Sequence, residues 1–81
     1  MAWRVIDTDG EVWHVQAAAE RRANERFWQL MLSFRAAGAE RAPRTVWAAT
    51  PIESLSKSTL FLQADRLSDA DLRRVLAQHR S

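Results

Sequence analysis

Eighty-one residues provide for one hydrophobic core, so we expect a single small globular domain over residues 1–81. Hydrophobic residues make up 47% and charged residues 27% of the chain, which excludes a disordered composition. Without cysteine there is neither a disulfide framework nor a thiolate metal site, and a net charge of +2 is weak evidence for a polyanionic partner.

Residues 3–15, WRVIDTDGEVWHV, predict a β-hairpin, because two runs rich in Val, Ile and Trp flank a cluster of turn residues. We expect a three-residue loop of Thr8, Asp9 and Gly10, with Asp7 facing Glu11. In that register Trp3 opposes Val15 and Val5 opposes Trp13, which places these four apolar side chains on one face. The other face would then carry Arg4, Ile6, Val12 and His14.

Residues 25–36, ERFWQLMLSFRA, fit two periodicities. A helix aligns Phe27, Leu30, Met31 and Phe34, and a strand aligns Trp28, Leu30, Leu32 and Phe34. The absence of β-branched residues favours a helix. We favour a strand, because a hairpin needs further strands to be stable and residues 44–49 predict one. Each predicted strand contains one tryptophan, so a four-stranded meander would bring Trp3, Trp13, Trp28 and Trp47 into a shared core.

The alternative layout keeps a helix at residues 25–36 between the hairpin and a third strand. Residues 16–24, QAAAERRAN, either start a helix or form a solvated connection.

The C-terminal third predicts two helices. Thr50, Pro51 and Glu53 form an N-terminal capping pattern, which predicts a helix from Pro51 toward Ala64. Residues 68–71, SDAD, form a second one, which predicts a helix over residues 69–79 with an apolar stripe of Leu72, Val75 and Leu76. The fold class we expect is α+β: a small antiparallel three- or four-stranded meander with one or two C-terminal helices.

Catalytic patterns are nearly absent from the sequence. Two glycines cannot form a glycine-rich phosphate loop, and no G-x-S-x-G turn occurs. Neither His14 nor His79 has a metal-ligating partner three or four residues away. We therefore expect no enzymatic activity, no cofactor and no metal. Serines and threonine in residues 54–59 are either helix caps or a phosphate-binding or modified segment.

Residues 20–44 contain six arginines and three glutamates, a local charge of +3. Arginines near tryptophan are typical of single-strand binding, although glutamates interrupt every arginine run. A nucleic-acid-binding module that uses Arg21, Arg22 and Arg26 is the alternative function.

Four tryptophans, three phenylalanines and two methionines are a large apolar content for so short a chain. Helices on one face of a sheet cannot cover both faces of a strand that is apolar on each side. An aromatic and methionine surface rimmed by arginine is typical of protein interfaces. We therefore predict a protein-interaction module, either a homo-oligomer or an accessory subunit, unless the connection over residues 17–24 covers the second face. The predicted contacts are Phe27, Met31, Ile6 and Val12, with Arg4 and Arg35 at the rim.

No apolar run approaches the roughly 18 residues that span a bilayer, and the N-terminus does not resemble a secretory signal. We expect a cytoplasmic protein that binds no membrane.

Overall fold

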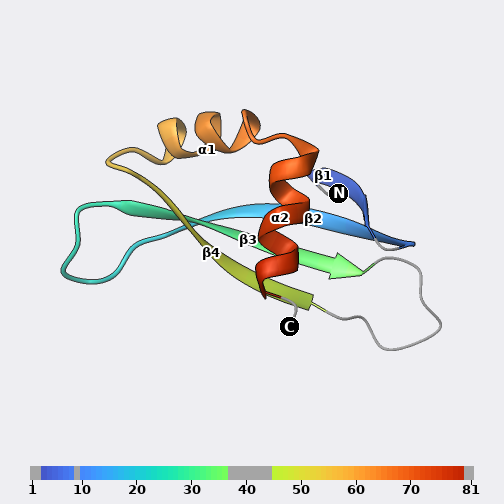
Figure 1. Cartoon of the computed structure of the whole chain (residues 1–81). Helices are drawn as coiled ribbons and strands as arrows, with labels where there is room; N and C mark the ends of the chain where they lie inside the picture. Colours follow the sequence, from blue (N-terminus) through green and yellow to red (C-terminus); the bar gives the residue numbers. More distant parts are fainter. Residues whose placement is uncertain (1–2, 9, 37–44, 80–81) are drawn as a thin grey trace.

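In a computed structural model, the chain forms a four-stranded antiparallel meander followed by two helices (Figure 1). The structure describes residues 3–8, 10–36 and 45–79. The sheet order is β1-β2-β3-β4. This architecture confirms the predicted α+β class. The elements are β1 (Arg4–Thr8), β2 (Glu11–Glu20), β3 (Trp28–Ala36), β4 (Thr45–Ser54), α1 (Lys57–Asp65) and α2 (Asp69–His79).

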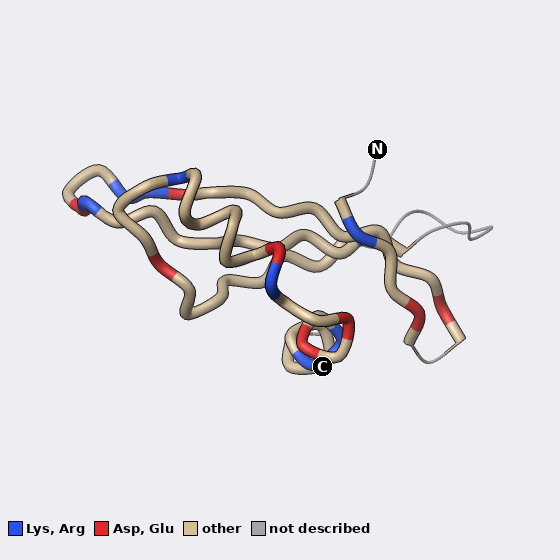
Figure 2. Tube along the Cα trace, turned by 90° about the horizontal axis from the view of Figure 1, so that it is seen from above, with Lys and Arg blue, Asp and Glu red and all other residues tan. Residues whose placement is uncertain are grey.

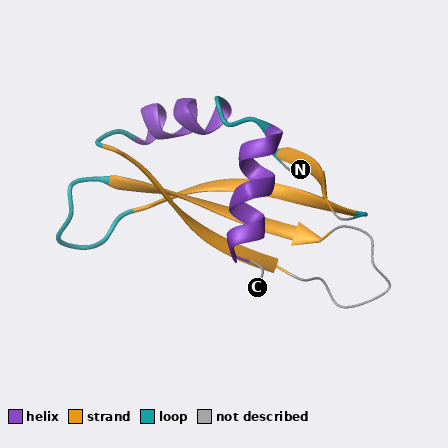
Figure 3. Cartoon of the chain, viewed as in Figure 1, coloured by secondary structure: helices purple, strands orange, loops and turns teal. Residues whose placement is uncertain are grey.

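Both helices pack on the same face of the sheet (Figure 3). Helix α1 lies against β2, β3 and β4, and α2 crosses the sheet so that it contacts both edge strands, β1 and β4. No helix covers the other face among the described residues. The two faces of the sheet therefore have different environments, which determines where each strand side chain lies.

The hairpin register differs by one residue from the prediction. Ile6 pairs with Trp13, and Thr8 pairs with Glu11, so only two residues lie between the paired strands. Gly10 has a φ of 77°, the left-handed conformation that two-residue hairpin turns require. The expected pairing of Val5 with Trp13 is wrong, and the predicted loop residue Asp9 lies outside the described residues. As a consequence Ile6 points to the helices and Val5 points away from them.

Residues 28–36 form a strand, which confirms the strand reading of this segment. Leu30, Leu32 and Phe34 point to the helices and are buried. Strand β2 is longer than expected, because residues 16–20 also pair with β3 instead of starting a helix. Ala17 and Ala19 pack against the core, where their small side chains leave room for α1.

The predicted helix start at Pro51 is wrong, because β4 continues through Ser54. The Thr50 side chain is buried within the sheet, where Oγ1 donates to the Leu30 carbonyl at 3.0 Å and accepts from the Ile52 N–H at 3.2 Å. These bonds lie at a register shift between β3 and β4, the kind of irregularity that accommodates a proline in an edge strand. Helix α1 instead begins after Ser56, whose Oγ accepts from the Thr59 N–H.

The core lies between the helices and the inner face of the sheet. The expected cluster of four tryptophans does not form: Trp13 is buried, Trp3 and Trp28 pack at the margin of the core, and Trp47 lies on the opposite face. The buried hydrophobic residues are Ile6, Trp13, Val15, Leu30, Leu32, Phe34, Ala48, Leu60, Ala64, Leu72 and Leu76.

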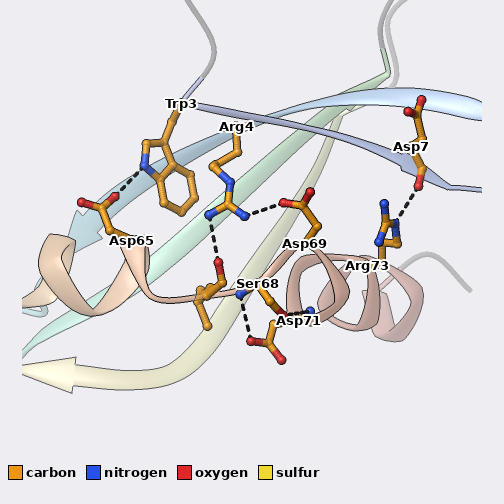
Figure 4. A network of polar contacts seen from close by, with 9 residues as sticks. Trp3, Arg4, Asp7, Asp65, Ser68, Asp69, Asp71 and Arg73 are labelled. Carbon is orange, nitrogen blue, oxygen red and sulfur yellow. Dashed lines mark hydrogen bonds and ion pairs between the residues drawn. The ribbon is translucent and has the colours of Figure 1, made fainter.

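Polar contacts between β1 and the helices hold the two layers together (Figure 4). Arg4 donates to the Leu67 carbonyl at 2.9 Å and to the Asp69 carboxylate at 2.5 Å. The Trp3 indole N–H donates to Asp65 at 2.9 Å. These bonds attach the first strand to the junction of α1 and α2.

Helix α2 has the predicted bounds and the predicted cap. Ser68 Oγ accepts from the Asp71 N–H and Asp71 accepts from the Ser68 N–H, both at 3.0 Å. This reciprocal pair satisfies two backbone donors that helix formation leaves free. Leu72 and Leu76 of the predicted stripe are buried, and Val75 is partly buried.

Candidate interaction surface

The face of the sheet turned away from the helices is the candidate site, and we call it the open face. Alternation along each strand assigns its members, since neighbouring residues point to opposite faces. Strand pairing then arranges these residues in one pair at the hairpin end, Asp7 with Val12, and in four rows across the sheet. The rows are the Arg35 row (Val5, His14, Arg35, Thr45), the Trp47 row (Gln16, Ser33, Trp47), the Met31 row (Ala18, Met31, Ala49) and the Gln29 row (Glu20, Gln29, Glu53).

The two middle rows of the open face carry no charge. Figure 2 shows this as an uncharged middle stretch of the strands, with Lys, Arg, Asp and Glu toward their ends and on the helices. Trp47 is the most prominent group, with 61% of its surface exposed. Met31 is partly buried on the same face, and its row neighbour Ala49 is exposed. A large exposed indole on a face without a helix is typical of a surface that binds another protein.

A hollow of about 170 Å³ lies beside this apolar middle, and we call it the Ala49 hollow. Met31, Ala49 and Gln29 line it from adjacent rows of the open face. The open face therefore has a projecting aromatic residue and, two residues further along β4, a depression. The complete lining is Glu20, Arg22, Glu25, Gln29, Met31 and Ala49.

The two outer rows carry opposite charge. Arg35 and His14 are neighbours in the Arg35 row, and both are exposed. Glu20 and Glu53 flank Gln29 in the Gln29 row, and both are exposed. Along the strands the open face thus runs from the basic Arg35 row, through an uncharged middle, to the acidic Gln29 row. Asp7 is exposed beyond the Arg35 row, and Arg22 and Glu25 lie beyond the Gln29 row.

Three of the predicted contact residues lie on the open face. Met31 and Arg35 are four residues apart on that side of β3, and Val12 is an exposed residue of β2 at the hairpin end. The remaining predicted residues lie elsewhere.

Ile6 and Arg4 do not lie where the predicted interface needs them. Ile6 is 2% exposed in the core and pairs with Trp13, so it forms no surface pair with Val12. Arg4 points to the helical side, where it bonds the junction of α1 and α2. Both corrections follow from the register shift, which exchanges the two faces of β1.

Phe27 and the predicted nucleic-acid residues lie on the connection between β2 and β3. Phe27 is 49% exposed and lines a shallow pocket of about 410 Å³ together with Asn24, Glu25, Arg26 and Glu53. Arg21 stacks on the Trp28 ring, with Cζ 4.8 Å from its centroid, and Lys57 Nζ lies 4.4 Å from the same centroid. The pocket thus combines Arg26 with Glu25 and Glu53, and the guanidinium of Arg21 contacts the Trp28 ring.

A second apolar group is exposed on the helical layer. Leu62 of α1 is 62% exposed, and Leu55 and Phe61 are exposed nearby in the chain. Because α1 packs on the inner face of the sheet, these residues are separated from the open face by the core. They serve as a comparison surface of similar exposure.

Two hydroxyl groups of residues 54–59, those of Ser54 and Ser56, act as local caps. Ser54 Oγ accepts from the Ser56 N–H, and Ser56 Oγ accepts from the Thr59 N–H, both at 3.3 Å. The described residues contain no group of three or more His, Asp or Glu side chains that could hold a metal ion. In the described part of the chain, neither α1 nor α2 is long and apolar enough to cross a membrane.

Trp47 and the acidic Gln29 row were not predicted as site residues. The signal for Trp47 is present in the alternation of residues 45–50, TVWAAT, where Val46, Ala48 and Thr50 point inward and Trp47 points outward. We expected Trp47 in the core because every predicted strand contained one tryptophan. The acidic row depends on the pairing of β2 with β3 and of β3 with β4, which sequence spacing does not show.

Comparisons with protein-family models, with curated proteins and with solved structures found no match.

Proposed function

We propose that this chain is a non-enzymatic protein-interaction module whose open face binds an apolar protein surface. The supporting observation is Trp47, which leaves 61% of its surface exposed on a face without a helix. Val5 and Val12 are exposed on the same face, and Met31 is partly buried there. An aromatic residue and a methionine with a charged rim match the composition of protein interfaces.

The size of the domain also supports a binding role. A chain this short leaves a large share of its surface accessible, so a partner that covers the open face would add apolar burial that one protomer cannot provide. A cytoplasmic location, in which the module acts as a homo-oligomer or as an accessory subunit, belongs to the same proposal.

The test compares Trp47→Asp with Leu62→Asp, because the two side chains are 61% and 62% exposed on different layers. We expect Trp47→Asp to abolish association measured by sedimentation velocity, while Leu62→Asp leaves it intact and both variants keep the wild-type circular dichroism. Association driven by apolar contact persists at high salt. A protein that stays monomeric and binds nothing through Trp47 would contradict the proposal.

The salt dependence separates this function from nucleic-acid binding. Binding of a nucleic acid through Arg21, Arg22 and Arg26 would weaken steeply as salt rises, because counterions are released when phosphates are neutralised. It would also be lost on replacing these arginines by alanine and be unaffected by Trp47→Asp. That pattern would replace the proposed function by the nucleic-acid alternative.

A further inference from the structure

We propose that the partner of the open face is a second copy of this chain, bound face to face. The two-fold axis lies in the plane between the two sheets and runs perpendicular to the strands. This inference rests on the proposed function, since it names the partner of the same surface. Two properties of the face support it, the charges of its outer rows and the shapes of its middle rows, and its size limits the affinity.

The charges select the direction of packing. An axis perpendicular to the strands, midway between the Trp47 row and the Met31 row, places the Arg35 row of one copy over the Gln29 row of the other. Arg35 then lies over Gln29, between Glu20 and Glu53 of the second copy, and the symmetry forms the same contact twice. An axis parallel to the strands would instead place the Arg35 row over the Arg35 row and the Gln29 row over the Gln29 row. Like charges at close range disfavour that alternative.

The shapes of the middle rows agree with the same axis. It places the Trp47 row over the Met31 row, so the projecting indole of each copy lies over Ala49 of the other. The Ala49 hollow borders that position through Ala49 and Met31, and it extends from there toward Gln29 and Glu20. Met31 lies over the small side chain of Ser33 in the same arrangement. Large groups therefore face small ones, as the packing of two sheets requires.

The size of the face limits the strength of the dimer. Its four rows extend about 20 Å along the strands, and its strands extend at most about 15 Å across the sheet. This corresponds to roughly 300 Å² per copy, or about 600 Å² for the pair, which is below the roughly 1,200 Å² at which stable protein interfaces begin. We therefore expect a dimer that dissociates on dilution.

A charge-reversal experiment tests the axis. Arg35→Glu places two acidic rows opposite each other, and the double variant Glu20→Arg, Glu53→Arg places two basic rows opposite each other. We expect each variant alone to dimerise at least about tenfold more weakly than the wild type, because close like charges replace opposite ones. In an equimolar mixture the two variants should form a heterodimer with affinity near that of the wild-type dimer. Leu62→Glu is the control for an added charge, because Leu62 is 62% exposed on the helical layer, away from the open face.

Analytical ultracentrifugation of the purified full chain over a concentration series gives each dissociation constant, and circular dichroism shows that each variant is folded. Variants that dimerise like the wild type, or a mixture that does not restore association, would overturn the inference. Its failure is distinguishable from failure of the proposed function. If the wild type is monomeric but binds a different protein through Trp47, only the homodimer is refuted. If it binds nothing through Trp47, both are refuted.

Discussion

Arg4 donates a hydrogen bond of 2.5 Å to Asp69, although 65 positions separate the two residues in the chain. Its second guanidinium nitrogen donates to the Leu67 carbonyl at 2.9 Å. The side chain thus connects the first strand to the start of α2 (Figure 4). Because α2 reaches from β1 to β4, this contact positions the helix that covers much of the inner face.

Replacing Arg4 by methionine should lower the free energy of unfolding by about 1–2 kcal/mol, a value reduced from that of buried charged bonds because the pair is partly exposed. Methionine retains most of the aliphatic packing and removes both bonds. Denaturant titration measures the change. Arg74→Met is the control, since Arg74 makes only a 3.7 Å contact with Asp71 at the surface. Equal losses for both variants would show that the Arg4 contacts are unimportant.

Thr50→Val should destabilise the sheet by about 1–3 kcal/mol, because valine has a similar shape but leaves the Leu30 carbonyl and the Ile52 N–H without this partner. Thr50 is 4% exposed, so water cannot easily replace its hydroxyl. Thermal and chemical unfolding measure the effect.

Two control variants interpret the Thr50 result. Thr50→Ser retains the hydroxyl and should cost less than Thr50→Val. Thr45→Val, at an exposed position of the same strand, should change stability by no more than about 0.5 kcal/mol. If Thr50→Val is as stable as the wild type, the bonds at the register shift contribute nothing.

The Ser68–Asp71 cap should make the stability of the protein depend on pH in the acidic range. Bonds from the Ser68 backbone and side chain, together with the nearby Arg74 charge, lower the pKa of Asp71 below its ordinary value of 3.8. A carboxyl with a lowered pKa in the folded state stabilises the protein above its unfolded pKa, and this contribution disappears as pH falls through the folded pKa. We therefore expect the stability difference between the wild type and Asp71→Asn to shrink as the pH drops below 3.8.

Denaturant titration at several pH values between about 6 and 2 measures this difference. Ser68→Ala, which removes the partner side chain, should cost about 1 kcal/mol at neutral pH. A difference between wild type and Asp71→Asn that stays constant over the whole range would refute the role of the carboxylate.

The two faces of the sheet should respond differently to loss of a tryptophan. Trp13 is 1% exposed in the core, so Trp13→Ala should cost about 3–5 kcal/mol and bring the domain close to unfolding. Trp47→Ala, measured at a protein concentration too low for association, should leave the free energy of unfolding nearly unchanged. Acrylamide quenching of Trp fluorescence provides a second readout, since removing Trp47 should lower the quenchable fraction and removing Trp13 by Trp13→Phe should not. The opposite result would place Trp47 inside the protein.

Helix α2 shows which features were determined locally. Ser68 and Asp71 form a cap within one turn, and Leu72 and Leu76 repeat at helical spacing, so the short-range pattern predicts the helix and both of its ends. The strand at residues 28–36 was less certain, because apolar residues satisfy both periods there. Pairing with β2 and β4 decides it, since each provides backbone bonds that the segment alone cannot make.

The hairpin register was predicted wrongly because Val5 and Ile6 are adjacent and both apolar, so either one fits a buried position. The two-residue turn at Gly10 and the contacts of Arg4 with the helices select the register in which Ile6, and not Val5, is buried. The end of β4 was misjudged for a similar reason: Thr50 and Pro51 match a helix cap in sequence. In the fold the Thr50 hydroxyl bonds to Leu30, twenty residues away in the chain.

Short-range patterns predict the α+β class, the last helix and an excess of apolar side chains, because turn residues, caps and periodicity act over a few neighbours. Which of these apolar residues stay outside depends on the three-dimensional packing. Trp13 and Trp47 are both strand tryptophans, yet one is 1% and the other 61% exposed. Their difference arises from register and from the packing of both helices on one face, and these depend on contacts between residues far apart in the chain.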